Sequence, residues 1–402
     1  NYSFTVRIAM YSLPYITFFF FMLPFVFARR DRLAVRNPVL QSYGLAFPLL
    51  ILFFVSLRAF IYCDVIAYYK TYDRLPIGWS IQNIKKIFTE PYNYNSWEYG
   101  FLLLMWLCKN TFNNYFFFQF VISTLTLYIF ALVVKRHSSN IFLSFICLFI
   151  FYGLVVCFNT IRNALQMMLF LYSLKSLQTK KYGKYLLINL FGSLFHGAAF
   201  IYLLFTPLFL IRFNRKLVLY LFIVGNIVFL AQIKWMRPLA LSAIELLPAG
   251  IWKHRFEYYF VNAFQFSYGL TIGYLERMIT FIMFFFCFDK KKDDTILKNR
   301  VFNNAFYVYM LLYLFCSEYV IVFQRICGLL VFSYWFLYPF MYVSLKKKYS
   351  KMVFMILFVL YAVLRLISGS NTADSRYENA LLPHHNFYQY ESFLISNHVL
   401  QE

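Results

Sequence analysis

The sequence predicts an all-α, polytopic integral membrane protein, on three observations. The chain has 402 residues and is 62% hydrophobic but only 13% charged, whereas soluble domains are about 45–50% apolar and about 25% charged. Its mean hydropathy is +0.61. Apolar runs of roughly 17 to 25 residues recur between short basic loops, which is the pattern of spanning helices rather than of a membrane barrel. We expect about 11–12 transmembrane helices plus re-entrant or interfacial helices, in one membrane domain over 1–402.

The charge of the loops orients the spans, because cytoplasmic loops are rich in Lys and Arg. The stretch after the first span, 28–36, carries four arginines, and the stretches 289–300 and 345–352 are rich in lysine. We place all three inside. The expected spans are 8–28, 44–62, 114–134, 141–157, 158–177, 217–233, 270–288, 301–323, 325–345 and 351–368. The first run is interpreted as a retained span rather than a signal peptide.

Two segments do not fit as simple crossings. The run after Trp97 has only about 11 apolar residues, which favours a re-entrant or interfacial helix. Segment 185–211 must begin and end inside, so we expect a bent hairpin with Gly192 and Gly197 at its turn and His196 at its deep tip. In the alternative, 185–211 is one tilted span, 212–216 lies outside, and 238–252 crosses. The cationic residues of 212–216 favour the hairpin.

The formal net charge of +22 is explained by this topology, since most of the basic residues fall in inside loops, and no nucleic-acid partner is needed. The seven cysteines form no CxxC pair, so neither a disulfide framework nor a metal site is expected. The outer segments 63–97, 236–269 and the tail 369–402 are expected to cap the active site.

A set of polar residues remains unexplained by the inside loops. Apart from His196, which lies within an apolar run, they fall at or near the outer ends of spans or in outer segments. They are Asp64, Glu98, Arg162, His196, Arg255, Glu257, Glu276, Arg277, Glu318 and Arg325. Ionisable residues within membrane segments are costly and mark functional sites by default. The non-functional alternatives are that each arginine extends its charged end to the membrane surface and that the histidine makes a structural hydrogen bond.

This pattern suits an anionic, lipid-linked substrate that carries sugars. Arginine offers a planar fork of donors that matches phosphate oxygens and can stabilise a diphosphate leaving group. A histidine or carboxylate can accept the proton of an attacking hydroxyl, and tyrosines can stack on sugar rings, although an interfacial aromatic belt also explains them. The candidates for the base are His196, Asp64, Glu98 and Glu257, and those for stacking are Tyr68, Tyr72 and Tyr258. The carboxylates lack DxD or paired spacing, so no metal and no cofactor are predicted.

The order of these features resembles the EpsG family of Wzy-type polysaccharide polymerases. The matching pieces are YCDVIAYYKTYD (62–73), EYG (98–100), TIRNALQMMLFLYSLK (160–175), LFHGAAFIYLL (194–204), KHRFEYY (253–259) and FQRICGLLVFSYWFLYP (323–339). The resemblance spans nearly the whole chain, but each motif is short. Gly197 and Ala198 follow the histidine where the family pattern leads us to expect a more polar small residue.

The resemblance implies a GT-C-like membrane glycosyltransferase that is inverting and metal-independent. It would act at the outer face of a bacterial cytoplasmic membrane, joining undecaprenyl-diphosphate-linked repeat units into a capsule, exopolysaccharide or O-antigen. Arg162, with Arg255, Arg277 or Arg325, would bind the diphosphate, and His196 would position or deprotonate the acceptor. The implied partners are the lipid-linked donor and acceptor, membrane lipid, and possible chain-length and flippase proteins.

Two other functions stay open on the sequence. A ligase or another lipid-linked glycosyltransferase would move glycan from the same carrier to a different acceptor. A flippase or transporter would require charges near the midplane and inverted repeats with broken helices, and neither is evident in the sequence.

Overall fold

A computed structural model describes residues 2–27, 38–90, 97–248, 269–288 and 297–397, together with positions 250, 253, 254, 257 and 399. Within these ranges, side chains are described except at 2–10, 38–45, 297–299 and 320–324. The chain forms two compact units, one from Asn1–Leu203 with Tyr338–Glu402 and one from Leu204–Leu337. Each unit is described separately below.

The described residues are helical and contain no β-strand; the β-type pairing is an isolated bridge between Arg58 and Asn379. The helices of the first unit are α1 (Tyr2–Phe27), α2 (Pro38–Ser56), α3 (Asp64–Arg74), α4 (Ile81–Thr89), α5 (Tyr99–Thr111), α6 (Tyr115–His137), α7 (Ile141–Leu148), η3 (Phe149–Gly153), η4 (Val155–Asn159), α8 (Ile161–Gln178), α9 (Tyr182–Ser193), α18 (Lys348–Gly369), η7 (Ala373–Ser375) and α19 (Phe387–Ser396). Those of the second unit are α11 (Arg215–Leu230), α12 (Met236–Glu245), α14 (Ile272–Met283), η6 (Phe284–Phe288), α15 (Leu297–Cys316) and α16 (Val320–Leu330). The helices α10 (Ala198–Leu210) and α17 (Phe332–Ser344) contain the unit boundaries.

The all-α prediction is confirmed for the described residues, and their helices are consistent with a helical membrane protein. Two of the described helices, Tyr115–His137 and Lys348–Gly369, are long and apolar enough to cross a bilayer. Shorter apolar helices cover Tyr11–Phe27, Ala46–Ser56, Ile141–Gly153 and Ala198–Leu210. The expected total of 11–12 spans stays a prediction.

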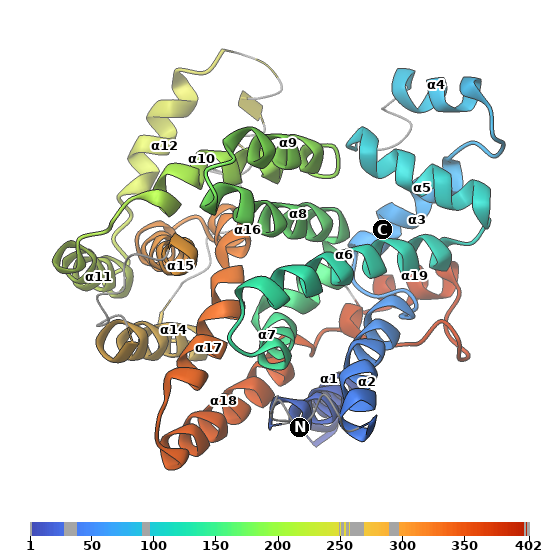
Figure 1. Cartoon of the computed structure of the whole chain (residues 1–402). Coiled ribbons are helices and arrows are strands. Elements are labelled where there is room, and N and C mark those ends of the chain that lie inside the picture. The colour runs from blue at the N-terminus through green and yellow to red at the C-terminus, as the bar shows by residue number, and fades with distance from the viewer. Residues whose placement is uncertain are drawn as a thin grey trace. The chain divides into compact units, whose positions relative to one another are not determined.

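Helix α8 is the centre of the first unit and packs between α6 and α9 (Figure 1). A three-residue turn reverses the chain after α8, so α9 runs back along it. Asn189 of α9 donates a hydrogen bond to Ser173 Oγ of α8 at 3.0 Å, and Gly192 lies over Gln166. The end of α9 therefore returns to the level of the first turn of α8.

The predicted break in 185–211 is confirmed, because α9 ends at Ser193 and α10 begins at Ala198. His196 lies in the turn between them. The expected depth of His196 in the membrane stays a prediction. Since α9 runs antiparallel to α8, the turn reaches the end of α8 that begins with Ile161.

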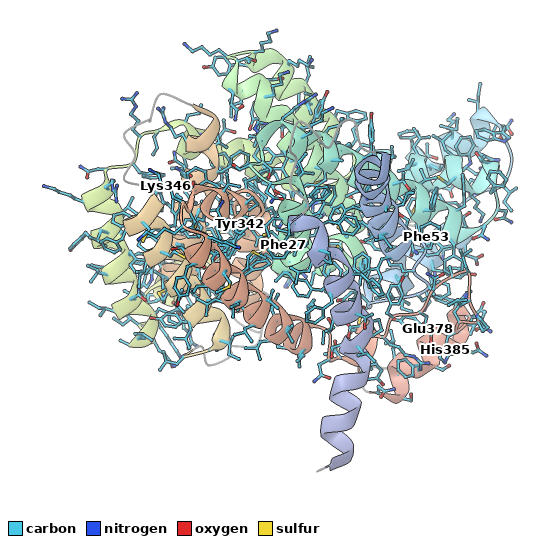
Figure 2. The ribbon with its side chains drawn as sticks, turned by 60° about the horizontal axis from the view of Figure 1, so that its bottom comes forward. Phe27, Phe53, Tyr342, Lys346, Glu378 and His385 are labelled. Atoms are coloured by element: carbon cyan, nitrogen blue, oxygen red, sulfur yellow. The ribbon has the colours of Figure 1, made fainter. Side chains whose placement is uncertain are left out.

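The segment after α2 differs from the prediction of a span over 44–62, since α2 ends at Ser56. The next residues are extended and pair with the C-terminal tail: Ala59 N–H donates to Glu378 O at 2.8 Å, and Ala380 N–H donates to Leu57 O at 2.7 Å. Glu378 and His385 of the tail also lie together, with His385 Nδ1 2.6 Å from Glu378 Oε1 (Figure 2). The tail is thus a folded part of the first unit.

Helix α3 is held between the tail and α5. On one side, Lys70 forms an ion pair with Glu391 of α19 at 2.6 Å, and the Tyr69 ring stacks on Phe387 at 4.2 Å. On the other side, the buried Lys109 of α5 donates to the carbonyl oxygens of residues 72, 73 and 75 at 2.8–3.0 Å. A cation bonded to the last carbonyls of a helix stabilises its C-terminus. These contacts fix the helix that carries Asp64 and Tyr68.

In the second unit, the basic stretch 212–216 lies near η6 and the first turns of α15. Arg215 at the start of α11 donates to Phe285 O of η6 at 2.7 Å, and Asn304 of α15 donates to Ile211 O at 2.8 Å. The stretch 212–216 thus lies at the same end as the residues flanking 289–296, which supports the hairpin topology. Helix α12 has 10 residues, about 15 Å in length, half of the roughly 30 Å that a crossing needs.

Candidate active site

An arginine and a glutamate from distant parts of the sequence form the centre of the site. Arg162 Nη1 lies 2.5 Å from Glu98 Oε2, and the two side chains are 20% and 26% exposed. Arg162 is the second residue of α8, and the N-cap residue Thr160 makes no side-chain cap bond. A cation in the first turn of a helix is disfavoured by the helix dipole, so Glu98 compensates both the charge and the dipole. The pair is partly exposed and sits where an anion is favoured.

The second oxygen of Glu98 binds the turn that carries His196. Glu98 Oε1 accepts a hydrogen bond from Gly197 N–H at 3.1 Å, and Phe101 N–H donates to Leu194 O at 3.2 Å. The close approach of α5 to Leu194 requires a glycine at position 100, because a Cβ there would lie 2.7 Å from Leu194 Cβ and 2.8 Å from Leu194 O. The glycine of the EYG motif thus permits the contact between α5 and the turn.

His196 is half-buried in this turn, and its contacts decide what its ring can do. Its Nδ1 accepts a hydrogen bond from Ala198 N–H at 3.0 Å, so Nδ1 carries no proton in this conformation. In a neutral imidazole the proton is then on Nε2, which makes Nε2 a donor. His196 is therefore arranged to donate a hydrogen bond rather than to accept a proton at Nε2.

Aromatic rings form the wall behind the arginine. The Arg162 guanidinium lies over the Trp97 ring, 4.8 Å from its centroid, and the Tyr68 ring is 5.1 Å from Trp97. Burial raises the pKa of Tyr68, and the charge of Asp64 raises it further while Arg162 opposes the shift. The Tyr68 phenol is thus neutral and within hydrogen-bond reach of Arg162. Because the Tyr68 ring is 3% exposed, it presents no open face for a sugar in this conformation.

Asp64 joins the site through the residues before α8, since Asn159 Oδ1 accepts a hydrogen bond from its backbone N–H at 3.1 Å. Its neighbour Cys63 lies 3.8 Å from Asp374 Oδ2 of the tail. Burial raises the pKa of the Cys63 thiol to about 12, with the charges of Asp374 and Asp64 adding to the shift. The start of α3 is thus an acidic edge of the Arg162 cluster.

Tyr72 was predicted to stack on a sugar, but in the structure its side chain packs in the protein interior. Its side chain is 4% exposed, its hydroxyl donates to Phe112 O at 3.3 Å, and its ring packs edge-on against Tyr115. The physical reason is the period of α3, which turns Val65, Tyr68 and Tyr72 to one buried face.

The remaining predicted residues belong to the second unit, so the structure does not join them to Arg162. Arg277 is enclosed by tyrosines: its Nε donates to the Tyr309 hydroxyl at 2.7 Å, and its guanidinium lies 4.2 Å from the Tyr313 ring centroid. Arg325 is exposed on α16, and Glu257 Oε2 lies 3.4 Å from His254 Nδ1. Arg255 and Tyr258 lie outside the described residues.

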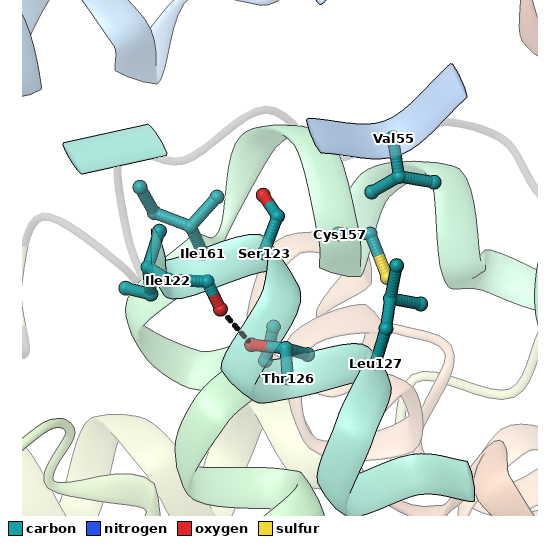
Figure 3. Close-up of a pocket in the computed structure, with 8 residues that line it drawn as sticks. Val55, Ile122, Ser123, Thr126, Leu127, Cys157 and Ile161 are labelled. Carbon is teal, nitrogen blue, oxygen red and sulfur yellow. Dashed lines mark hydrogen bonds between the residues drawn. The ribbon is translucent and has the colours of Figure 1, made fainter. Parts of the chain in front are cut away.

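Sequence reasoning missed a buried arginine of the first unit, which lies near the residues before α8. Arg58 is 1% exposed, donates to Val55 O and to Ser123 Oγ, the latter at 3.0 Å, and lies 4.9 Å from the Phe158 ring centroid. Ser123 belongs to a mainly apolar pocket whose lining includes Ile161 of α8 (Figure 3). The predicted span 44–62 includes Arg58, whereas α2 ends at Ser56 and leaves Arg58 in the extended segment that follows.

The described residues contain no group of three His, Cys, Asp or Glu side chains that could hold a metal ion. The donors of the site are an arginine, an imidazole and backbone N–H groups. They suit an anion.

A comparison with known families identifies the chain. The model of the EpsG family matches residues 42–392. The chain belongs to the EpsG family. Neither a search of curated proteins nor a search of solved structures finds a match. The EpsG match indicates a role in polysaccharide biosynthesis, and it includes every residue of the Arg162 cluster.

Trp97 and Asn159 are the site residues that sequence reasoning missed within the EpsG match. Both stand beside a predicted residue or motif, Trp97 directly before Glu98 and Asn159 directly before TIRNAL. An aromatic residue next to an acid and an amide at the start of an apolar helix were the available signals.

Proposed function

We propose that this EpsG-family protein is a polymerase that joins undecaprenyl-diphosphate-linked repeat units into a surface polysaccharide. The transfer is inverting and metal-independent, and it takes place at the outer face of a bacterial cytoplasmic membrane. The basic loops at 28–36, 289–300 and 345–352 support this orientation.

One observation carries the proposal. The Arg162–Glu98 pair and the bond from Glu98 to Gly197 gather the TIRNAL, EYG and LFHG motifs into one cluster. An arginine and the uncapped start of a helix suit a diphosphate, while a carboxylate and an imidazole suit an attacking hydroxyl. Donor and acceptor chemistry thus meet at adjoining residues.

The arginine in this cluster is engaged by Glu98, so substrate binding requires an exchange of partners. The diphosphate of the donor takes the guanidinium from Glu98, since a diphosphate offers more charge and more acceptor oxygens than one carboxylate. Glu98 is then free to accept a proton. We assign Glu98 as the base on this ground, with Asp64 as the next carboxylate at the edge of the cluster.

The step balances as a direct displacement. A hydroxyl oxygen at the non-reducing end of the incoming unit attacks the anomeric carbon of the growing glycan. A new C–O bond forms, and the bond from that carbon to the phosphate oxygen breaks with inversion. The leaving undecaprenyl diphosphate keeps the electron pair and is stabilised by Arg162, and the hydroxyl proton passes to Glu98. His196 donates its Nε2–H to an oxygen of the substrate.

The test is turnover by the purified protein of one synthetic lipid-linked repeat unit. The expected product is a ladder of increasing chain length, and Arg162→Ala should abolish it. The matched control is Arg136→Ala, which also removes a guanidinium from an aromatic ring, 4.6 Å from Tyr172 near the other end of α8, and should keep the ladder. A ladder from Arg162→Ala would remove this arginine from the site.

The same assay separates the rival functions. Transfer of the glycan to a different acceptor without a ladder would indicate a ligase. Movement of the lipid-linked unit across a vesicle membrane without any new glycosidic bond would indicate a flippase or transporter. Either outcome would replace the polymerase proposal.

A further inference from the structure

One residue of α8 has a polar side chain that the fold does not use. Gln166 is 0% exposed, and within the described part of the chain neither its Nε2 nor its Oε1 has a hydrogen-bond partner. Arg162 Nε and Asn163 Oδ1, one turn earlier, are also buried without a partner there. A buried amide without partners costs free energy. A fold that needed only packing at this position would be served by Leu or Met.

The position of Gln166 relates it to the site. It follows Arg162 by four residues, so both side chains lie on one face of α8. A Cβ on Gly192 would lie 3.5 Å from Gln166 Cγ, and His196 N–H donates to Gly192 O at 3.2 Å. The side chain of Gln166 therefore packs against the last turn of α9, which leads directly into the turn that carries His196, and it lies one helical turn from the arginine assigned to the diphosphate.

The same helix pair contains a buried amide that the fold does use. Asn189 of α9 is 1% exposed, and its Nδ2 donates to Ser173 Oγ at 3.0 Å and to Tyr185 O at 2.8 Å, while its Oδ1, like both polar atoms of Gln166, has no hydrogen-bond partner within the described residues. Asn189 thus joins α8 to α9 by a hydrogen bond, whereas the Gln166 amide makes none within the described part of the chain. The interface between α8 and α9 therefore contains one amide with a structural role, Asn189, and one amide that is a candidate for ligand binding, Gln166.

The chemistry of the carboxamide selects its ligand. It presents two N–H donors and one acceptor oxygen, so a diphosphate, which only accepts, would leave Oε1 without a partner. A sugar hydroxyl both donates and accepts and satisfies both ends of the amide. We propose that Gln166 recognises sugar hydroxyls of the lipid-linked substrate beside its diphosphate, an assignment that rests on the function proposed above.

Access to Gln166 follows from the exchange of partners at Arg162. The turn that follows Gly192 is bonded to α5 by Phe101 N–H to Leu194 O and by Gly197 N–H to Glu98 Oε1. The second bond uses the carboxylate that the diphosphate displaces from Arg162. A carboxylate released from Arg162 at Oε2 is free to rotate, so we expect diphosphate binding to weaken the bond from Gly197 to Oε1 and to loosen the packing of α9 on Gln166.

The test compares Gln166→Met, which keeps length and removes both polar atoms, with Asn189→Leu. Affinity is measured in nanodiscs for a lipid-linked repeat unit and for undecaprenyl diphosphate without sugar, beside thermal unfolding. Gln166→Met should bind the sugar-bearing lipid about tenfold or more weakly, bind the sugar-free lipid as the wild type does, and unfold no earlier. Asn189→Leu should unfold earlier and keep the wild-type difference in affinity between the two lipids.

Three outcomes would overturn the proposal. Equal affinity of Gln166→Met and wild type for the sugar-bearing lipid would leave the amide as a water or packing site. Earlier unfolding of Gln166→Met would show that the amide has a structural partner. Failure of the wild type to prefer the sugar-bearing lipid would exclude sugar recognition altogether.

Measuring binding and turnover separately distinguishes failure of the sugar site at Gln166 from failure of the polymerase function. A wild type that prefers the sugar-bearing lipid through Gln166 but makes no ladder would contradict the polymerase and support the sugar site. Repeating the affinity measurement with a lipid-free oligosaccharide of the same repeat unit assigns the source. Weaker binding of that oligosaccharide by Gln166→Met places the amide at the acceptor sugar, and an effect confined to the lipid-linked unit places it at the donor sugar.

Discussion

Replacing Gly100 by alanine tests whether the contact between α5 and the 194–197 turn shapes the site. The added Cβ would lie 2.7 Å from Leu194 Cβ and 2.8 Å from Leu194 O, whereas ordinary contacts begin at 3.4 Å. The turn must therefore move by about 0.7 Å, the difference between 3.4 and 2.7 Å. That shift stretches the bonds from Phe101 to Leu194 and from Gly197 to Glu98, which are already 3.2 and 3.1 Å long.

The expected effect is larger on turnover than on stability. A displacement near 1 Å at a reacting group can cost about 100-fold in rate, and over-packing costs about 1–3 kcal/mol. We expect Gly100→Ala to lower kcat by roughly 10- to 100-fold while the protein still inserts and purifies. The assay is the rate of ladder formation from a synthetic lipid-linked repeat unit, beside thermal unfolding in the same detergent.

Gly183→Ala is the matched control, because Gly183 is also the second residue of its helix and a Cβ there meets nothing within 4 Å. It should keep full activity and be equally or more stable, since alanine is favoured over glycine in helices by up to about 1 kcal/mol. Wild-type rates from both variants would refute the view that this contact positions the catalytic groups.

Three further predictions concern the site and the topology. His196→Asn should keep more activity than His196→Ala, because an asparagine oxygen can accept the hydrogen bond from the backbone N–H two residues on; equal losses would make the ring itself the essential group. Asp374→Asn should speed alkylation of Cys63 at pH 8, since removing a negative charge lowers the raised thiol pKa and increases the thiolate fraction; an unchanged rate would leave burial and the charge of Asp64 as the causes of the shift. A thiol at Ala67 should react with an impermeant reagent from outside, and one at Lys216 only from inside; the reverse pattern at Lys216 would restore the single tilted span over 185–211.

Local sequence patterns were sufficient to predict several elements, because the presence of those elements depends on composition and length. The short apolar run after Trp97 predicted a helix too short to cross, and α5 has 13 residues. Basic loops on both sides of 185–211 predicted that this segment begins and ends inside and therefore bends, and its helix is interrupted at 194–197. In both cases the physical requirement, hydrocarbon thickness or loop charge, is visible in the sequence itself.

The pairing of residues across the site was not visible in the sequence. Glu98 and Arg162 were both singled out as polar residues near helix ends, but their contact depends on how α5 packs on α8, which no local pattern specifies. Tyr72 was assigned to sugar on its residue type, although its spacing from Val65 and Tyr68 already marked a buried helix face. The unpartnered amide of Gln166 became informative only when its neighbours were known.

The affinity of undecaprenyl diphosphate for the wild type and for Glu98→Gln tests the central claim most directly. If the diphosphate must take Arg162 from Glu98, removing the carboxylate charge should tighten binding several-fold while ladder formation falls by about 100-fold or more, because the base is lost. Arg162→Ala should lose this binding. Unchanged or weaker binding by Glu98→Gln would contradict the exchange of partners at Arg162 on which the mechanism rests.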